Sequence, residues 1–239
     1  MLQATQIADW FVDYQTNEGA PVDPMSLEKH LYYAQGFSLG VRREALFSDP
    51  IEAWKYGPVV NNVWSRYSGV GHAPILTAKA PPPELEPATE EFLCQVADFL
   101  SPFPALQLSR ATHKEAPWVN AFAKPKFHPF DNNPISVDAM RDWFGSLIEE
   151  GEEALSRHAM LDVLPEPHWG WLYIAGICTR SLVDHPFFVT GTSLWKAKLS
   201  DMPIQADPFD VNLYRPPTRA DASGRADFAN LDEYLKSRA

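Results

Sequence analysis

Cysteine is scarce in this chain of 239 residues, which contains only Cys94 and Cys178. Each lies inside an apolar run, and the two do not have the spacing by which cysteines hold zinc. We therefore expect two buried, reduced thiols rather than a disulfide framework. The seven histidines include no HExxH motif and no pair four residues apart, so the sequence predicts no metal site and no cofactor.

Long hydrophobic runs and an excess of basic residues are also missing. No stretch approaches the roughly 20 apolar residues of a membrane-spanning helix, and the opening MLQATQIADWF lacks the regions of a signal peptide. We expect a cytoplasmic protein without membrane contact. The formal net charge is −11, with 20 scattered basic residues against 31 acidic ones. This balance argues against direct nucleic-acid binding, which depends on neutralising phosphates, and suits a basic partner.

Catalytic and phosphate-binding motifs are lacking as well. The chain has no GxGxxG, no GxxxxGK[ST] and no GxSxG. His113 and Glu115 lie within one turn and could form an acid–base pair, but the favoured interpretation is that they orient the start of a helix. A hydrolytic enzyme that uses this pair stays an alternative. Because no other feature supports catalysis, we predict a protein without catalytic residues.

The first half of the chain contains apolar residues with helical periodicity. Apolar residues recur at steps of three and four within residues 7–14, 27–34 and 92–100. Asp23 followed by Pro24 is typical of a helix start, because the carboxylate can accept a free N–H and proline needs none at that position. The sequence therefore predicts a mainly α fold.

Glycine, proline and serine suggest where the helices begin and end. Gly36 and Gly40 are expected to weaken the helix that starts at Pro24. Gly57-Pro58 predicts a further helix start, preceded by a short extended link. Ser136 is expected to cap the best-defined helix of the chain.

The composition changes near residue 160. Residues 169–179 and 186–194 are apolar, aromatic and β-branched and are candidate strands, although a buried helix fits the first segment equally. Residues 203–224, rich in Pro, Asp and Ala, predict an arm without regular structure. The predicted organisation is a compact helical domain over residues 1–150 and a less regular C-terminal extension over residues 151–239.

Three blocks of the sequence stand out: LEKHLYYAQGFSL, then ALFSDPIEAWKYGPVV, then LSRATHKEAPW. In this order and spacing they resemble the Panacea domain, also called SocA-like, of bacterial and phage antitoxins. The resemblance covers about residues 1–147 and leaves residues 150–239 outside. Phe37 stands where the family usually has Trp, and Asn61 and Trp64 stand where Pro and Tyr are common.

The resemblance implies an antitoxin that neutralises a cognate protein toxin by direct binding, with the extension as a candidate clasp. It also implies an alternative, a proteolytic adaptor that delivers the toxin to the ClpXP protease, with residues 231–239 as a candidate contact. Protein–protein hot spots are enriched in Tyr and Trp. The residues expected to bind a partner are Tyr33, Trp54, Tyr56, His113, Glu115 and Trp118.

Overall fold

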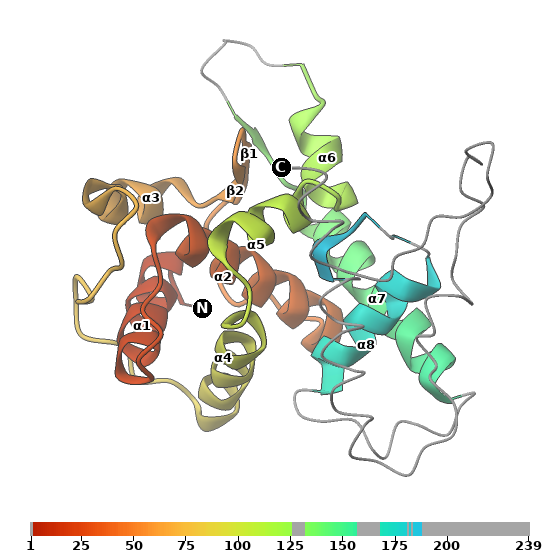
Figure 1. Ribbon diagram of the computed structural model, residues 1–239, viewed down its shortest axis with the longest axis horizontal. Helices are drawn as coiled ribbons and strands as arrows, with labels where there is room; N and C mark the ends of the chain where they lie inside the picture. The colour runs from red at the N-terminus through yellow and green to blue at the C-terminus, as the bar shows by residue number, and fades with distance from the viewer. Residues whose placement is uncertain (1, 126–131, 157–167, 181, 183, 188–239) are drawn as a thin grey trace, which may run out of the picture.

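The computed structural model describes residues 2–125, 132–156, 168–180, 182 and 184–187. Within them, helices dominate and three short strands form one small sheet, so the mainly α fold class is confirmed (Figure 1). The helices are α1 (Ala4–Asn17), α2 (Pro24–Phe37), α3 (Asn61–Tyr67), α4 (Pro87–Leu100), α5 (Ala105–Thr112), α6 (Ala116–Phe122), α7 (Val137–Ser156) and α8 (His168–Thr179). The strands are β1 (Glu52–Trp54), β2 (Gly57–Val59) and β3 (Asn133–Pro134); a π-helical turn η1 (Ser38–Arg42) and a 3-10 turn η2 (Ser68–Val70) complete the elements.

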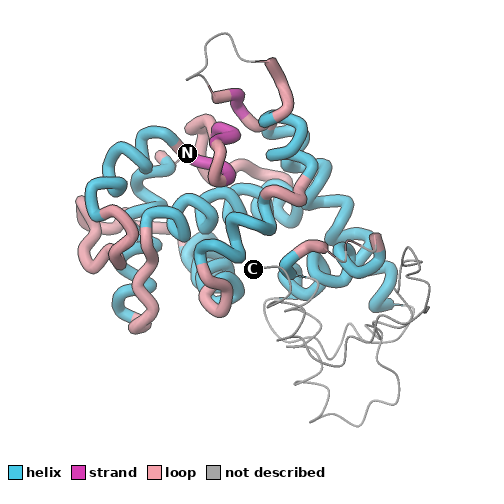
Figure 2. The backbone as a smooth tube through the Cα atoms, turned by 45° about the horizontal axis from the view of Figure 1, so that its top comes forward, coloured by secondary structure: helices cyan, strands magenta, loops and turns pink. Residues whose placement is uncertain are grey.

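Helix α2 is the centre of the fold. It runs across the middle of the molecule and contacts α1, α3, α4, α5 and α7, while the three strands gather at one end (Figures 1 and 2). Its start is the one predicted: Asp23 Oδ1 accepts the Ser26 N–H at 2.8 Å, and Pro24 is the first helical residue. Because α2 is surrounded by other helices, nearly all of its residues are buried.

The regular α-helix ends at Phe37, directly after Gly36, and Gly40 lies in the π-helical turn η1, in agreement with the predicted weakening of the helix end. The chain continues through η1, and Arg43 follows with a left-handed φ of 59°. A Cβ atom on Gly36 would lie 2.3 Å from the ring of Phe144, and one on Gly40 would lie 3.0 Å from Phe144 Cβ. The two glycines therefore let α7 approach the backbone of α2 and of η1.

Gly57-Pro58 does not start a helix, so that prediction is also wrong. The dipeptide lies in β2, which pairs antiparallel with β1 in the register Glu52↔Val59 and Trp54↔Gly57. β3 pairs with the other side of β1, which leaves β2 at the sheet edge. An edge strand tolerates proline, because the missing N–H is not needed for a second ladder. The expected helix begins later, at Asn61.

Residues 169–179 lie in helix α8, so the strand assignment is wrong and the alternative of a buried helix is confirmed. Pro186 and Phe187 are helical too. The rest of the second candidate strand, the arm over residues 203–224 and residues 231–239 lie outside the described residues. None of the described helices is long and apolar enough to cross a membrane.

Helix α7 begins as predicted, since Ser136 Oγ accepts the Ala139 N–H at 3.3 Å. It continues past residue 150 to Ser156 and contacts α8 along its length. The buried residues of α8 share one hydrophobic core with those of α2 and α7. The division of the chain into residues 1–150 and 151–239 stays a prediction.

His30 is a buried histidine between α1 and α2. Its Nδ1 lies 2.9 Å from the Ser26 carbonyl oxygen, and its Nε2 lies 3.3 Å from Gln15 Nε2. A neutral ring with its proton on Nδ1 donates to the carbonyl and accepts from the amide. Burial lowers the pKa of His30 to about 4, so the folded state keeps this ring neutral near pH 7.

We expect the protein to lose stability as the pH falls from about 6.5 towards 4. In this window the unfolded chain protonates His30 and the folded chain does not, so acidification favours unfolding. The depressed pKa corresponds to about 3 kcal/mol. Denaturant titrations from pH 7 to pH 4 should therefore show a loss about 3 kcal/mol larger for the native sequence than for His30→Gln. Equal losses would contradict a buried neutral His30.

Candidate functional site

The six residues predicted to bind a partner fall into two groups. Tyr33 and Glu115 are fully buried, with no exposed surface. The other four surround the turn between β1 and β2, where Tyr56 is 63% exposed and Trp54 is half-buried. The structure thus separates one candidate surface from one buried cluster. The group around the turn is Trp54, Tyr56, His113 and Trp118, of which Trp118 is itself buried, with 6% of its surface exposed.

Side chains from three helices and the segment between α5 and α6 hold the backbone of this turn. Trp118 Nε1 donates to the Trp54 carbonyl at 3.1 Å, and Ser109 Oγ donates to the Tyr56 carbonyl at 2.9 Å. His113 Nε2 lies 3.0 Å from the Lys55 carbonyl oxygen. Lys29 Nζ donates to the Pro58 carbonyl at 3.0 Å. Four of the five backbone carbonyls of residues 54–58 therefore have a fixed hydrogen-bond partner, so the turn has a defined shape.

Two buried ionisable residues of α2, Glu28 and Lys29, hold the backbone of β2 and of the residue after it. Glu28 Oε2 accepts the Val60 N–H at 2.8 Å, next to the bond between Lys29 and Pro58. Burial raises the pKa of Glu28 and lowers that of Lys29, because each charge is removed from water. Gly57 makes the close approach possible: its φ is +105°, and a Cβ there would lie 2.6 Å from Lys29 Cε. No L side chain fits this position without displacing the lysine.

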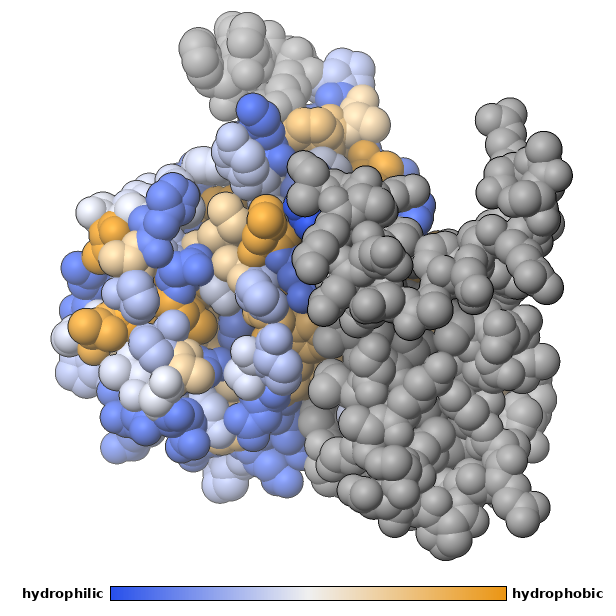
Figure 3. Space-filling view, viewed as in Figure 1, coloured by the Kyte–Doolittle hydropathy of each residue, from blue (hydrophilic) through white to orange (hydrophobic). Residues whose placement is uncertain are grey.

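An aromatic surface extends from the turn onto α6. The rings of Trp54 and Trp64 lie 6.1 Å apart, and Trp118 stacks on Phe122 at 4.5 Å. Val119 and Phe122 are 40% and 37% exposed, and Figure 3 shows hydrophobic residues gathered over α6. We call this surface the hairpin face. It consists of Trp54, Lys55, Tyr56, Trp64, Val119 and Phe122.

Glu115 is the centre of the buried cluster. Its Oε1 accepts from Tyr33 Oη at 2.8 Å and from Tyr173 Oη at 3.0 Å, and His185 Nε2 lies 3.3 Å away. His185 Nδ1 accepts the Phe187 N–H at 3.2 Å, which places the ring proton on Nε2, facing the carboxylate. Burial, and next the charge of Glu115, raise the pKa of Tyr33 and Tyr173 well above the usual value, so both stay donors.

This arrangement joins α2, the start of α6, α8 and the segment after α8. Glu115 occupies the N-cap position of α6, but its side chain makes no capping hydrogen bond. The interpretation that its side chain orients the helix start is therefore wrong. His113 faces the carbonyl oxygens of Lys55 and Ser109 instead of Glu115, so the structure does not bring together the acid–base pair of the enzyme alternative.

Several residues of both groups were not singled out from the sequence. Lys29 and Ser109 lie inside the first and third blocks, and Lys29 stands between Glu28 and His30 on α2. Tyr173 and His185 lie in the predicted extension and meet Glu115 from 58 and 70 residues away. No local spacing indicates such partners.

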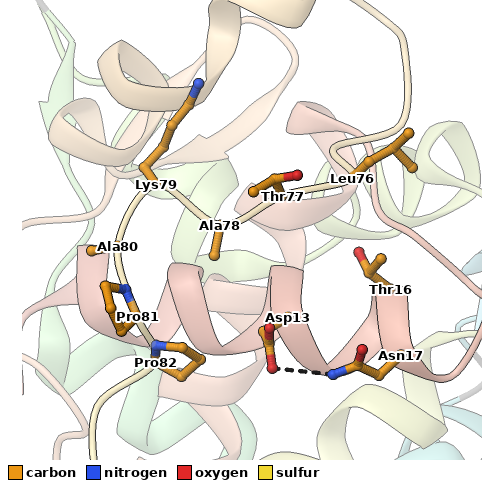
Figure 4. A pocket seen from close by; sticks show the side chains of 10 residues that line it. All are labelled: Asp13, Thr16, Asn17, Leu76, Thr77, Ala78, Lys79, Ala80, Pro81 and Pro82. Atoms are coloured by element: carbon orange, nitrogen blue, oxygen red, sulfur yellow. Dashed lines mark hydrogen bonds between the residues drawn. The ribbon is translucent and has the colours of Figure 1, made fainter.

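A surface cleft of about 380 Å³ lies between α1 and residues 76–82 (Figure 4). On the side of the cleft formed by α1, Asn17 donates to Asp13 at 3.2 Å. The side chain of Lys79 points away from both residues. Catalytic and ligand sites usually combine an apolar pocket with convergent polar groups. This cleft does not show that convergence, and the described residues contain no group of three potential metal ligands.

Comparison with known proteins adds one finding. Residues 27–119 match the family described as antitoxin SocA-like, Panacea domain, a narrower range than the predicted 1–147 but one that contains all three blocks. No curated protein and no solved structure matches the chain. The matched range spans α2 to the middle of α6 and includes Glu115 and most of the hairpin face. Residues 27–119 of this chain are therefore similar to the antitoxin SocA-like, Panacea domain.

Proposed function

We propose that this protein is a cytoplasmic antitoxin that neutralises a cognate protein toxin by direct contact. The match of residues 27–119 to the antitoxin-like domain carries the proposal. The hairpin face supports it, since it exposes aromatic and apolar side chains on a backbone that is already fixed. A preformed surface loses little conformational freedom on binding, so more of the contact energy appears as affinity.

Neutralisation in this scheme needs shape and contact area rather than bond-making groups. A standard protein–protein interface removes about 800 Å² of surface from each partner, enough to cover the working surface of a small toxin. Central aromatic residues usually supply most of the binding energy of such an interface. Tyr56, exposed at the tip of the turn, is the side chain best placed for that part.

The test is co-expression with the product of the adjacent gene. We expect that product to stop growth alone, and this protein to restore growth and to co-purify with it. A harmless product, or two proteins that do not co-purify, would overturn the proposal. Repeating the rescue in a host without ClpXP separates direct neutralisation, which persists there, from delivery to the protease, which fails.

A further inference from the structure

The charge around the hairpin face differs from that of the chain as a whole. The elements β1, β2, α3, α5 and α6 contain a single acidic residue, Glu52, which accepts the Trp54 Nε1–H at 2.8 Å. Lys55 in the turn and Arg110 on α5 are exposed, and Arg110 directly follows the serine that holds the Tyr56 carbonyl. Among the described residues, no carboxylate forms an ion pair with either of them.

Most of the acidic residues lie outside these elements, although Asp49 accepts from Asn62 and Asp9 pairs with Arg66, both on α3. Helix α7 alone carries six carboxylates and one arginine, in a chain whose net charge is −11. Opposite charges across an interface raise the association rate and fix the orientation of the partner, because the potentials are complementary. Lys55 beside exposed aromatic residues, with few acidic side chains on these elements, therefore favours a partner surface with carboxylates next to an apolar centre.

Other exposed apolar residues do not form a comparable surface. The remaining exposed large apolar residues lie on different elements: Val41 in η1, Val70 in η2, Leu76 in the loop after it, Leu106 on α5 and Val137 at the start of α7. By contrast, the buried Trp118 connects two members of the hairpin face, because it donates to the Trp54 carbonyl and stacks on Phe122. Lys55 Nζ lies 5.3 Å from the centre of the Tyr56 ring, which places cation and aromatic ring side by side.

We infer that the hairpin face is the toxin-binding surface of this protein, and that it takes an apolar patch on the toxin bordered by Asp or Glu side chains. This inference rests on the proposed function and adds the location and the chemistry of the contact. Basic and aromatic residues also occur together at single-stranded nucleic-acid sites, but the overall charge of −11 opposes the approach of a phosphate backbone. A protein occupant is therefore favoured.

The test uses the full-length chain and the purified toxin encoded by the adjacent gene, in calorimetric titrations at 50 and 300 mM salt. Tyr56→Ala should weaken binding by roughly 30-fold, as expected for a central aromatic anchor. Lys55→Glu should weaken it by about tenfold at 50 mM salt and reduce its salt dependence. The matched controls Leu76→Ala, at a side chain 66% exposed, and Lys79→Glu, at another exposed lysine, should bind within about twofold of the native protein.

Different outcomes overturn different statements. If the native protein does not bind the toxin, the proposed function fails. If it binds, and Tyr56→Ala and Lys55→Glu bind equally well, the hairpin face is not the contact and the proposed function stands. If Lys55→Glu binds the toxin more tightly than the native protein, the inference that Asp or Glu side chains border the toxin's patch is wrong. A labelled 20-nucleotide single strand that binds the native protein and is displaced by the toxin overturns the choice of a protein occupant. Unchanged melting temperatures of the variants show that folding does not explain the result.

Discussion

Glu115→Ala is expected to destabilise the protein by about 3–5 kcal/mol, because it removes the acceptor from the centre of a buried polar cluster. Tyr33, Tyr173 and His185 would each keep a donor that faces the empty position. A buried donor without a partner costs about 1–3 kcal/mol, since the group has been taken out of water. Domains of this size are stable by only about 5–15 kcal/mol. In chemical denaturation, Glu115→Ala should therefore unfold at a clearly lower denaturant concentration than the native protein.

Two variants control this experiment. Glu115→Gln keeps one acceptor oxygen in the same place, so its loss should be smaller than that of Glu115→Ala. Glu91→Ala removes an exposed carboxylate from α4 and should stay within about 0.5 kcal/mol of the native protein. If Glu115→Ala unfolds at the same denaturant concentration as Glu91→Ala, the cluster does not hold α2, α6 and α8 together.

The consequences reach the hairpin face. Glu115 precedes α6, and α6 carries Trp118, which holds the Trp54 carbonyl, and the exposed Val119. A displacement of α6 would remove the hydrogen bond from Trp118 that holds the turn at Trp54. Toxin binding should therefore weaken in Glu115→Ala although this carboxylate is fully buried. The buried group of predicted binding residues would then act by positioning the exposed group.

The sequence predicts the parts of the fold that depend on neighbouring residues. Asp23 and Pro24 start α2 as expected, and Ser136 caps α7, because a cap needs only the next three residues. Gly57-Pro58 is ambiguous, since the same pair fits a helix start and the edge of a sheet. The choice is made by Lys29 and Thr112, which lie close to Gly57 only in the folded chain.

Helix α8 shows why short apolar runs are hard to assign. Almost every side chain of α8 is buried, so the sequence has no polar face from which a helical period could be read. The length of 12 residues favours a helix over a typical strand of about five or six. The Glu115 cluster could not be predicted by any local rule, because its partners approach from 58 to 82 residues away.

Gly176→Val is expected to destabilise the protein by about 3 kcal/mol or more, because overpacking against a backbone cannot be relieved by a change of rotamer. A Cβ on Gly176 would lie 2.0 Å from the Leu147 carbonyl oxygen, and one on Gly151 would lie 1.9 Å from the Leu172 carbonyl oxygen. Helices α7 and α8 therefore touch backbone to backbone at both glycines. The added side chain must displace α8 from α7, and this displacement breaks the hydrogen bond between Tyr173 and Glu115.

Hydrogen exchange across α8, together with denaturant unfolding, measures this effect. Gly69→Ala is the matched control, because nothing lies within 4 Å of its added Cβ, and it should change stability by less than about 0.5 kcal/mol. Native-like protection of α8 in Gly176→Val would show that α8 does not rest on the α7 backbone. Faster exchange in α8 with toxin binding intact would show that the hairpin face depends on α2, α5 and α6 alone. Loss of both would mean that α8, through Tyr173 and Glu115, holds α6 in its binding position.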